Sequence, residues 1–141
     1  MGRSFIFASA LEPEAAARAV AASPQPPDLI VTSPSQLARE TAARAVDGRW
    51  VFTVEEPLLA ARSPGESGDN VLWRVTRAVR DLVVYDAGVT LIVVDGLDIL
   101  GAGAFVLDEA AVVRLAEDLD HALPPPLSSA ILPLLRDVPG S

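Results

Sequence analysis

The sequence predicts an α/β fold of three layers, in which helices flank both faces of a central, mostly parallel sheet. Short apolar, β-branched runs alternate along the chain with segments of helical periodicity, an order typical of parallel sheets with right-handed crossovers. The run Val89–Val94 is apolar except for the β-branched Thr90, as expected of a central strand covered on both faces. A length of 141 residues suits one domain with a single core, so we treat 1–141 as one domain.

The N-terminal part of the chain contains two predicted strand–helix units. Ser4–Ser9 is the first strand, and Pro13–Ala22 is the helix that follows it. The second strand is Asp28–Thr32. The second helix, Pro34–Val46, opens on a proline near its first turn, where a missing N–H costs nothing. It stops at Asp47–Gly48, a helix-ending pair.

A third strand and a long loop follow. Arg49–Val54 is rich in β-branched and aromatic residues, which predicts a strand. Glu55–Asn70 is rich in Pro, Gly and Ser and is the longest irregular stretch that we expect, which makes it a candidate lid or binding loop. We expect Glu66 in this loop to cap the next helix, together with the good N-terminal residues Ser67 and Asp69.

The last elements that we expect are two helices, the strand Val89–Val94 between them, and an apolar tail. Val71–Val84 is predicted as a helix, because its apolar residues recur at helical spacing. We expect Arg74, Arg77 and Arg80 to lie away from this apolar face. Asp108–Leu123 is the last helix, which a run of three prolines ends. The tail contains the apolar segment Leu127–Leu135.

Composition and charge exclude several classes of function. The net charge of −8 argues against binding to nucleic acid or an acidic membrane, because both require a dense basic surface. All 11 basic residues are arginine, so a Walker-type phosphate loop, a receiver-type site and a Schiff base cannot form. There is no cysteine and no apolar run long enough for a membrane span. We expect a cytoplasmic location and no cofactor.

The second strand–helix unit carries the most informative motif. A strand that delivers its carboxyl end to a helix N-terminus is where α/β proteins hold anions. This unit resembles the second unit of the histidine phosphatase (phosphoglycerate mutase-like) superfamily, with the pattern S-S-P-x-x-R-A-x-x-T-A. The matching residues are Thr32, Ser33, Pro34, Ala38, Thr41 and Ala42. Leu37 stands where the family has a phosphate-binding arginine.

The same resemblance implies that the other catalytic positions are also replaced. The family's R-H-G after the first strand corresponds to Ala8-Ser9-Ala10, so Ser9 stands at the nucleophilic histidine. Within EPLLAARSPGES, Ala61 stands at the family's acid, and Gly96 in VVDGLD stands at its second histidine. The resemblance is strongest over 5–100, and 101–141 diverges. It implies a phosphoglycerate mutase-like fold with the phosphohistidine reaction lost.

The histidine count supports this interpretation independently. The chain has 1 histidine, His121, near the end of the last predicted helix, whereas the family's reaction needs two histidines and several arginines. We therefore expect a catalytically inactive domain, a pseudophosphatase, with a binding, regulatory or assembly role. The candidate cleft or ligand-binding residues are Ser9, Ser33, Leu37, Arg39, Arg62, Asp95 and Asp98.

Three alternatives stay open. One is a phosphatase or other hydrolase with a relocated site, in which Ser9, Asp95 and Asp98 act with or without Mg²⁺, although a turn is the favoured role for the two aspartates. Another is a small-molecule module whose emptied cleft is lined by Leu37, Ala61 and Leu97. The third is a flavodoxin-like fold, which would leave the motif unexplained. We expect no bound metal.

The expected partners are a second copy of the chain or another protein. Half of the residues are hydrophobic and the mean hydropathy is +0.35, which suggests that an oligomer hides part of the apolar surface. The segment Leu127–Leu135 is the candidate contact for a homodimer.

Overall fold

A mixed five-stranded sheet with the strand order β3-β2-β4-β1-β5 forms the centre of the fold. In this computed structural model the described residues are 2–95 and 104–121. Strands β1 to β4 are mutually parallel, and β5 runs antiparallel to β1. The strands are β1 (Ser4–Ser9), β2 (Leu29–Thr32), β3 (Thr53–Glu55), β4 (Val89–Val94) and β5 (Ala104–Asp108).

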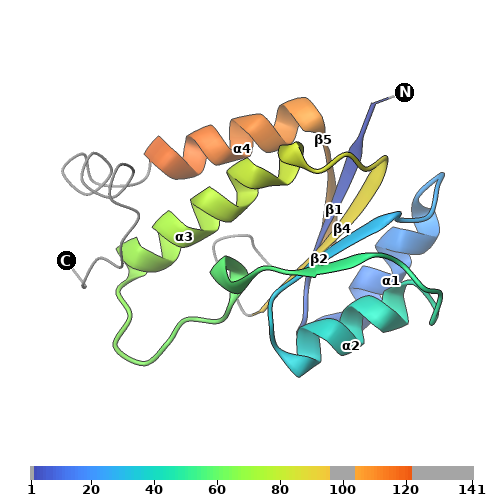
Figure 1. Ribbon diagram of the computed structural model, residues 1–141, viewed down its shortest axis with the longest axis horizontal. Coiled ribbons are helices and arrows are strands. Elements are labelled where there is room, and N and C mark those ends of the chain that lie inside the picture. Colours follow the sequence, from blue (N-terminus) through green and yellow to red (C-terminus); the bar gives the residue numbers. More distant parts are fainter. Residues whose placement is uncertain (1, 96–103, 122–141) are drawn as a thin grey trace.

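Helices cover both faces of the sheet, so the predicted α/β class and its three layers are confirmed. Helices α1 and α2 lie on one face, and α3 and α4 lie on the other (Figure 1). The helices are α1 (Pro13–Ala22), α2 (Gln36–Ala45), α3 (Gly68–Asp81) and α4 (Glu109–His121), with short 3₁₀ turns η1 (Pro57–Leu59) and η2 (Leu82–Val84). Within the described ranges, no helix is both long and apolar enough to span a membrane.

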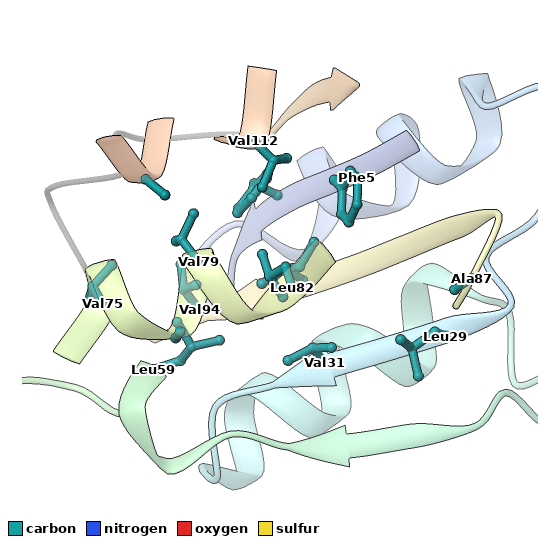
Figure 2. Packing of buried hydrophobic residues seen from close by; sticks show 14 residues of the cluster. Phe5, Leu29, Val31, Leu59, Val75, Val79, Leu82, Ala87, Val94 and Val112 are labelled. Atoms are coloured by element: carbon teal, nitrogen blue, oxygen red, sulfur yellow. The ribbon is translucent and has the colours of Figure 1, made fainter. Parts of the chain in front are cut away.

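Alternation along the strands divides the core into two clusters. On β1, Ile6 points to the cluster under α1 and α2, whereas Phe5 and Phe7 point to the cluster under α3 and α4. Figure 2 shows the second cluster, where Val79 and Leu82 lie between α3 and the sheet. The strands near the centre, β1, β2 and β4, therefore bury both faces, which explains why their sequences are mostly apolar.

The predicted boundaries of β1, α1 and β4 are confirmed, and several others are wrong. The strand β5 was not predicted; its antiparallel pairing makes the sheet mixed. The third strand is short and starts at Thr53, so most of Arg49–Val54 is not strand. The expected segment Leu127–Leu135 lies outside the described residues.

Helix α2 begins later than predicted because its cap is Ser35 and not the proline. The Ser35 hydroxyl accepts the Ala38 N–H at 3.0 Å, which satisfies one of the free amides of the first turn. Pro34 therefore precedes the helix and does not sit in its first turn. After α2 the chain turns through Asp47 at φ 56° and Gly48 at φ 71°, as a left-handed helix end requires.

The segment predicted as the long loop Glu55–Asn70 is partly ordered into helix. It contains η1, and α3 already starts at Gly68. The cap of α3 is Ser67, whose hydroxyl accepts the Asn70 N–H at 3.0 Å. Glu66 is not the cap, because its carboxylate has other partners that are described below.

Candidate functional site

The carboxyl ends of β1, β2 and β4 meet at one edge of the sheet, as the sequence predicts for a ligand site in this class of fold. The Ala10 N–H donates to the Val94 carbonyl at 2.8 Å, and the Ser33 N–H donates to the Val93 carbonyl at 2.9 Å. These bonds bring Ser9, Ser33 and the residue after β4, Asp95, to the same edge.

The Ser9 side chain is engaged in a local turn at the end of β1. Its hydroxyl oxygen accepts the Leu11 N–H at 3.1 Å, and the residue is buried. A serine becomes a nucleophile only when an adjacent base takes its proton. Among the described residues, the only ionisable group that directly follows a neighbouring strand at this edge is Asp95, which is half-buried.

Two hydroxyls at the end of β2 are fully buried without a partner. Thr32 Oγ1 and Ser33 Oγ accept and donate no hydrogen bond within the described part of the chain. Burying such a group unpaired costs about 1–3 kcal/mol. These hydroxyls lie below the surface and offer no open contact to a ligand.

Leu37 covers part of the α2 N-terminus with apolar surface. The residue is 44% exposed and is the second residue of the helix. A helix N-terminus attracts anions through its free amides and its dipole, but a leucine there supplies neither charge nor a donor. The position that the resemblance assigns to an arginine is therefore apolar and open to solvent.

The two candidate arginines are already held by other groups. Arg39 donates to the Pro34 carbonyl at 2.7 Å and pairs with Glu55 at 3.2 Å, with both side chains about half exposed. The Arg62 Nε donates to the Glu66 carbonyl at 2.8 Å. Each guanidinium therefore stabilises its own loop or edge.

The remaining candidates are only partly described. Gly96, Leu97 and Asp98 lie outside the described residues, so the pairing of Asp95 with Asp98 is not tested. Across 2–95 and 104–121, no group of 3 or more His, Cys, Asp or Glu side chains could hold a metal ion. Ala61 is exposed, and its carbonyl accepts a bond from Arg74 at 3.3 Å.

Arg74 is buried, although the sequence predicted that it lies away from the packed face of its helix. It is only 8% exposed. Its Nη1 donates to the Leu58 and Ala60 carbonyls at 2.8 and 2.7 Å, and its Nε and Nη2 donate to the two carboxylate oxygens of Glu66 at 2.7 and 2.9 Å. This side chain therefore fastens η1 and the following loop to α3.

The same contacts control the ionisation of Glu66. The Arg74 side chain, more than any other group, lowers the pKa of Glu66 from 4.5 to about 2. Burial opposes this change, and N–H donors from Ser63 and Asn70 add to it. The candidate lid or binding loop is thus tied to α3 by an ionic clamp.

A groove of about 650 Å³ lies beside the edge strand β3, and the sequence interpretation missed it. Trp50 and Phe52 line it and are 85% and 59% exposed. Arg39 and Arg49 also line it. The signal was the run RWVF, because Trp50 and Phe52 are two positions apart and therefore lie on the same face of an extended segment.

A second groove of about 390 Å³ runs between α3 and α4. His121 lines it, together with Val79 and Val112, so this histidine belongs to the face opposite α1 and α2. Leu37 and Ala61 line neither of these two grooves.

Comparison with known proteins does not identify a family. No protein-family model matches the sequence, and no curated protein matches it.

Proposed function

We propose that this chain is a catalytically inactive domain of the histidine phosphatase type, with a phosphoglycerate mutase-like fold, that serves a binding, regulatory or assembly role. The observation that carries the proposal is the chemistry of the carboxyl edge of the sheet. The described side chains there include a serine engaged in a turn, two unpartnered buried hydroxyls, an exposed leucine and the half-buried Asp95. The mostly parallel sheet with helices on both faces is compatible with the proposed ancestry.

Phosphoryl transfer needs more than these groups supply. The transferring phosphoryl group carries negative charge, which positive side chains or amides must stabilise. Arg39 and Arg62 are tied to Glu55 and to the Glu66 carbonyl, and Asp95 adds a negative charge at the edge. A serine beside a carboxylate, without imidazole or amine, is a weakly activated nucleophile.

A hydrolysis assay tests the proposal. The purified chain is incubated with p-nitrophenyl phosphate, with and without Mg²⁺, beside Ser9→Ala and Asp95→Asn variants. We expect release of p-nitrophenol at the same background rate from all three proteins, and no binding of phosphate or vanadate by calorimetry. Turnover by the wild type that either substitution abolishes would overturn the proposal and favour a hydrolase built on Ser9 and Asp95.

A further inference from the structure

The outer side of β3 is an open sheet edge. This strand is the last in the order β3-β2-β4-β1-β5, and among the described residues no strand pairs with its outer side. An unpaired edge is a template for a further strand, and proteins commonly protect it. Here two large aromatic side chains, Trp50 and Phe52, stand exposed beside it.

The bonds to β2 define which backbone groups of this edge are free. The Ile30 N–H donates to the Phe52 carbonyl at 2.9 Å, and the Glu56 N–H donates to the Thr32 carbonyl at 2.7 Å. Even-numbered residues of the edge thus direct their backbone groups to β2. In an extended strand, the odd-numbered residues between them direct theirs outward.

Side-chain packing supports this extended conformation. Val51 packs against the cluster under α1 and α2, whereas Val54 packs against the cluster under α3 and α4. Residues of opposite parity therefore lie on opposite faces, as a strand requires. The Thr53 hydroxyl donates to the Val51 carbonyl at 2.9 Å, and the second lone pair of that carbonyl stays available.

The sequence of this edge is complementary to itself when reversed. The edge reads Arg49-Trp50-Val51-Phe52-Thr53-Val54-Glu55. If two copies pair antiparallel about Phe52, Val51 of each faces Thr53 of the other, and Arg49 faces Glu55. All residues in these pairs have odd numbers, so their backbone groups point outward, toward the second copy. Phe52 then faces its own copy at a pair without backbone bonds, where side chains approach most closely.

We infer that β3 pairs antiparallel with β3 of a second copy of this chain, with a two-fold axis at Phe52, so that the two sheets become continuous. The inference deepens the proposed assembly role and rests on it. Such an interface is isologous, because each copy offers the same surface. It removes Phe52 from water and places Trp50 against Val54 of the other copy.

Charge complementarity supports pairing at this edge. Two chains of net charge −8 repel each other in general. At this edge Arg49 has no acidic partner of its own in the described part of the chain; its Nε donates to the Val46 carbonyl. Glu55 binds Arg39 through Oε2, which leaves Oε1 for the partner's Arg49. The two-fold axis creates this ion pair twice.

Two charge-reversal variants of the full chain, studied separately and as a mixture, test the inference. Sedimentation equilibrium should show a dimer for the wild type. Arg49→Glu alone and Glu55→Arg alone each place two like-charged pairs across the axis, and each should weaken dimerisation by about tenfold or more. An equal mixture of the two variants restores both pairs, so it should form heterodimers, and the double variant should again form homodimers. A monomeric wild type, or a mixture that stays monomeric, overturns the inference.

Thr53→Pro tests the backbone pairing separately. The Thr53 N–H points outward, so proline there leaves the bonds to β2 intact and removes one bond from each copy to the other, two in the dimer. The variant should keep the circular dichroism and thermal unfolding of the folded chain and lose the dimer. Val106→Thr, an exposed residue of the opposite edge strand β5, is the matched control and should stay dimeric. A Thr53→Pro dimer as tight as the wild type would refute the pairing.

The outcomes for the dimer and for catalysis are separable. A wild-type monomer without phosphatase activity refutes the β3 pairing and leaves the inactive domain in place. Hydrolysis of p-nitrophenyl phosphate that depends on Ser9 refutes the proposed function whatever the oligomeric state.

Discussion

The clamp between Glu66 and Arg74 makes stability depend on pH in a way that one substitution can test. Glu66→Gln keeps the size and shape of the side chain and removes its charge. The carboxylate accepts two bonds from Arg74 and one each from the Ser63 N–H and Asn70 Nδ2. An amide NH₂ facing these donors leaves at least one of them unpaired, and so does a protonated glutamic acid.

The pKa of Glu66 gives the magnitude. One pKa unit corresponds to about 1.4 kcal/mol, so a pKa lowered from 4.5 to about 2 sets a ceiling of about 3 kcal/mol on the stabilisation. The side chain is 11% exposed, and partial screening reduces the expected free energy of unfolding lost in Glu66→Gln to about 2 kcal/mol at pH 7. Because the folded pKa is lowered, this contribution is complete above the unfolded pKa of 4.5 and disappears as pH falls toward 2.

Urea unfolding at pH 7 and pH 3, followed by the fluorescence of the buried Trp73, checks this expectation. The difference between wild type and Glu66→Gln should fall to less than half between the two pH values. Glu109→Gln is the control, because Glu109, which pairs with Arg3, is half exposed, and the substitution should cost under about 0.5 kcal/mol at either pH. An equal loss for Glu66→Gln at both pH values would refute the argument, since the charge would then contribute nothing.

Four further substitutions separate groups that hold the fold from groups that do not. Asp28→Asn should destabilise the chain more at pH 7 than at pH 3 in urea unfolding: burial raises the Asp28 pKa, but N–H donors, Val89 foremost, lower it overall. Thr32→Val should raise stability by about 1 kcal/mol by removing an unpaired buried hydroxyl; a loss instead would mean that the hydroxyl has a partner. Thr41→Val should cost about 1–2 kcal/mol in thermal unfolding, because its buried hydroxyl bond is lost. Leu37→Arg should leave the unfolding temperature within about 1–2 °C and add phosphate binding detectable by calorimetry without hydrolysis.

The elements that the sequence predicts correctly are those whose pattern of apolar residues directly reflects which of their faces are buried. Val89–Val94 is almost entirely apolar because helices cover both faces of this central strand, so its boundaries were predicted correctly. The strand β5 was missed because Ala104–Asp108 is short, lies at an edge and leads directly into α4. Helix capping was partly missed, because proline and Ser35 are both good residues for a helix start and only the structure decides between them.

The candidate site was less predictable because it depends on sheet order. A parallel arrangement predicts that Ser9, Ser33 and Asp95 lie together beyond the carboxyl ends of their strands. The bonds among β1, β2 and β4 place them there. No periodicity indicates that Arg74 is buried, since its partners lie on a loop whose path the helical pattern does not encode. The exposed aromatic residues at β3 also depend on which strand forms the edge of the sheet.

The motif on which the proposed ancestry rests is made of residues that hold the fold, so its presence does not depend on a catalytic site. Ala38, Thr41 and Ala42 are at most 3% exposed, and the Thr41 hydroxyl donates to the Ala10 carbonyl at 3.1 Å, which ties α2 to the end of β1. Leu37, the mismatched position, is exposed and contributes little packing. Substitution of the buried set costs stability in any protein with this fold, whereas substitution at an exposed position costs only function. Agreement at the first set with disagreement at the second is therefore the pattern that the proposed inactive domain predicts.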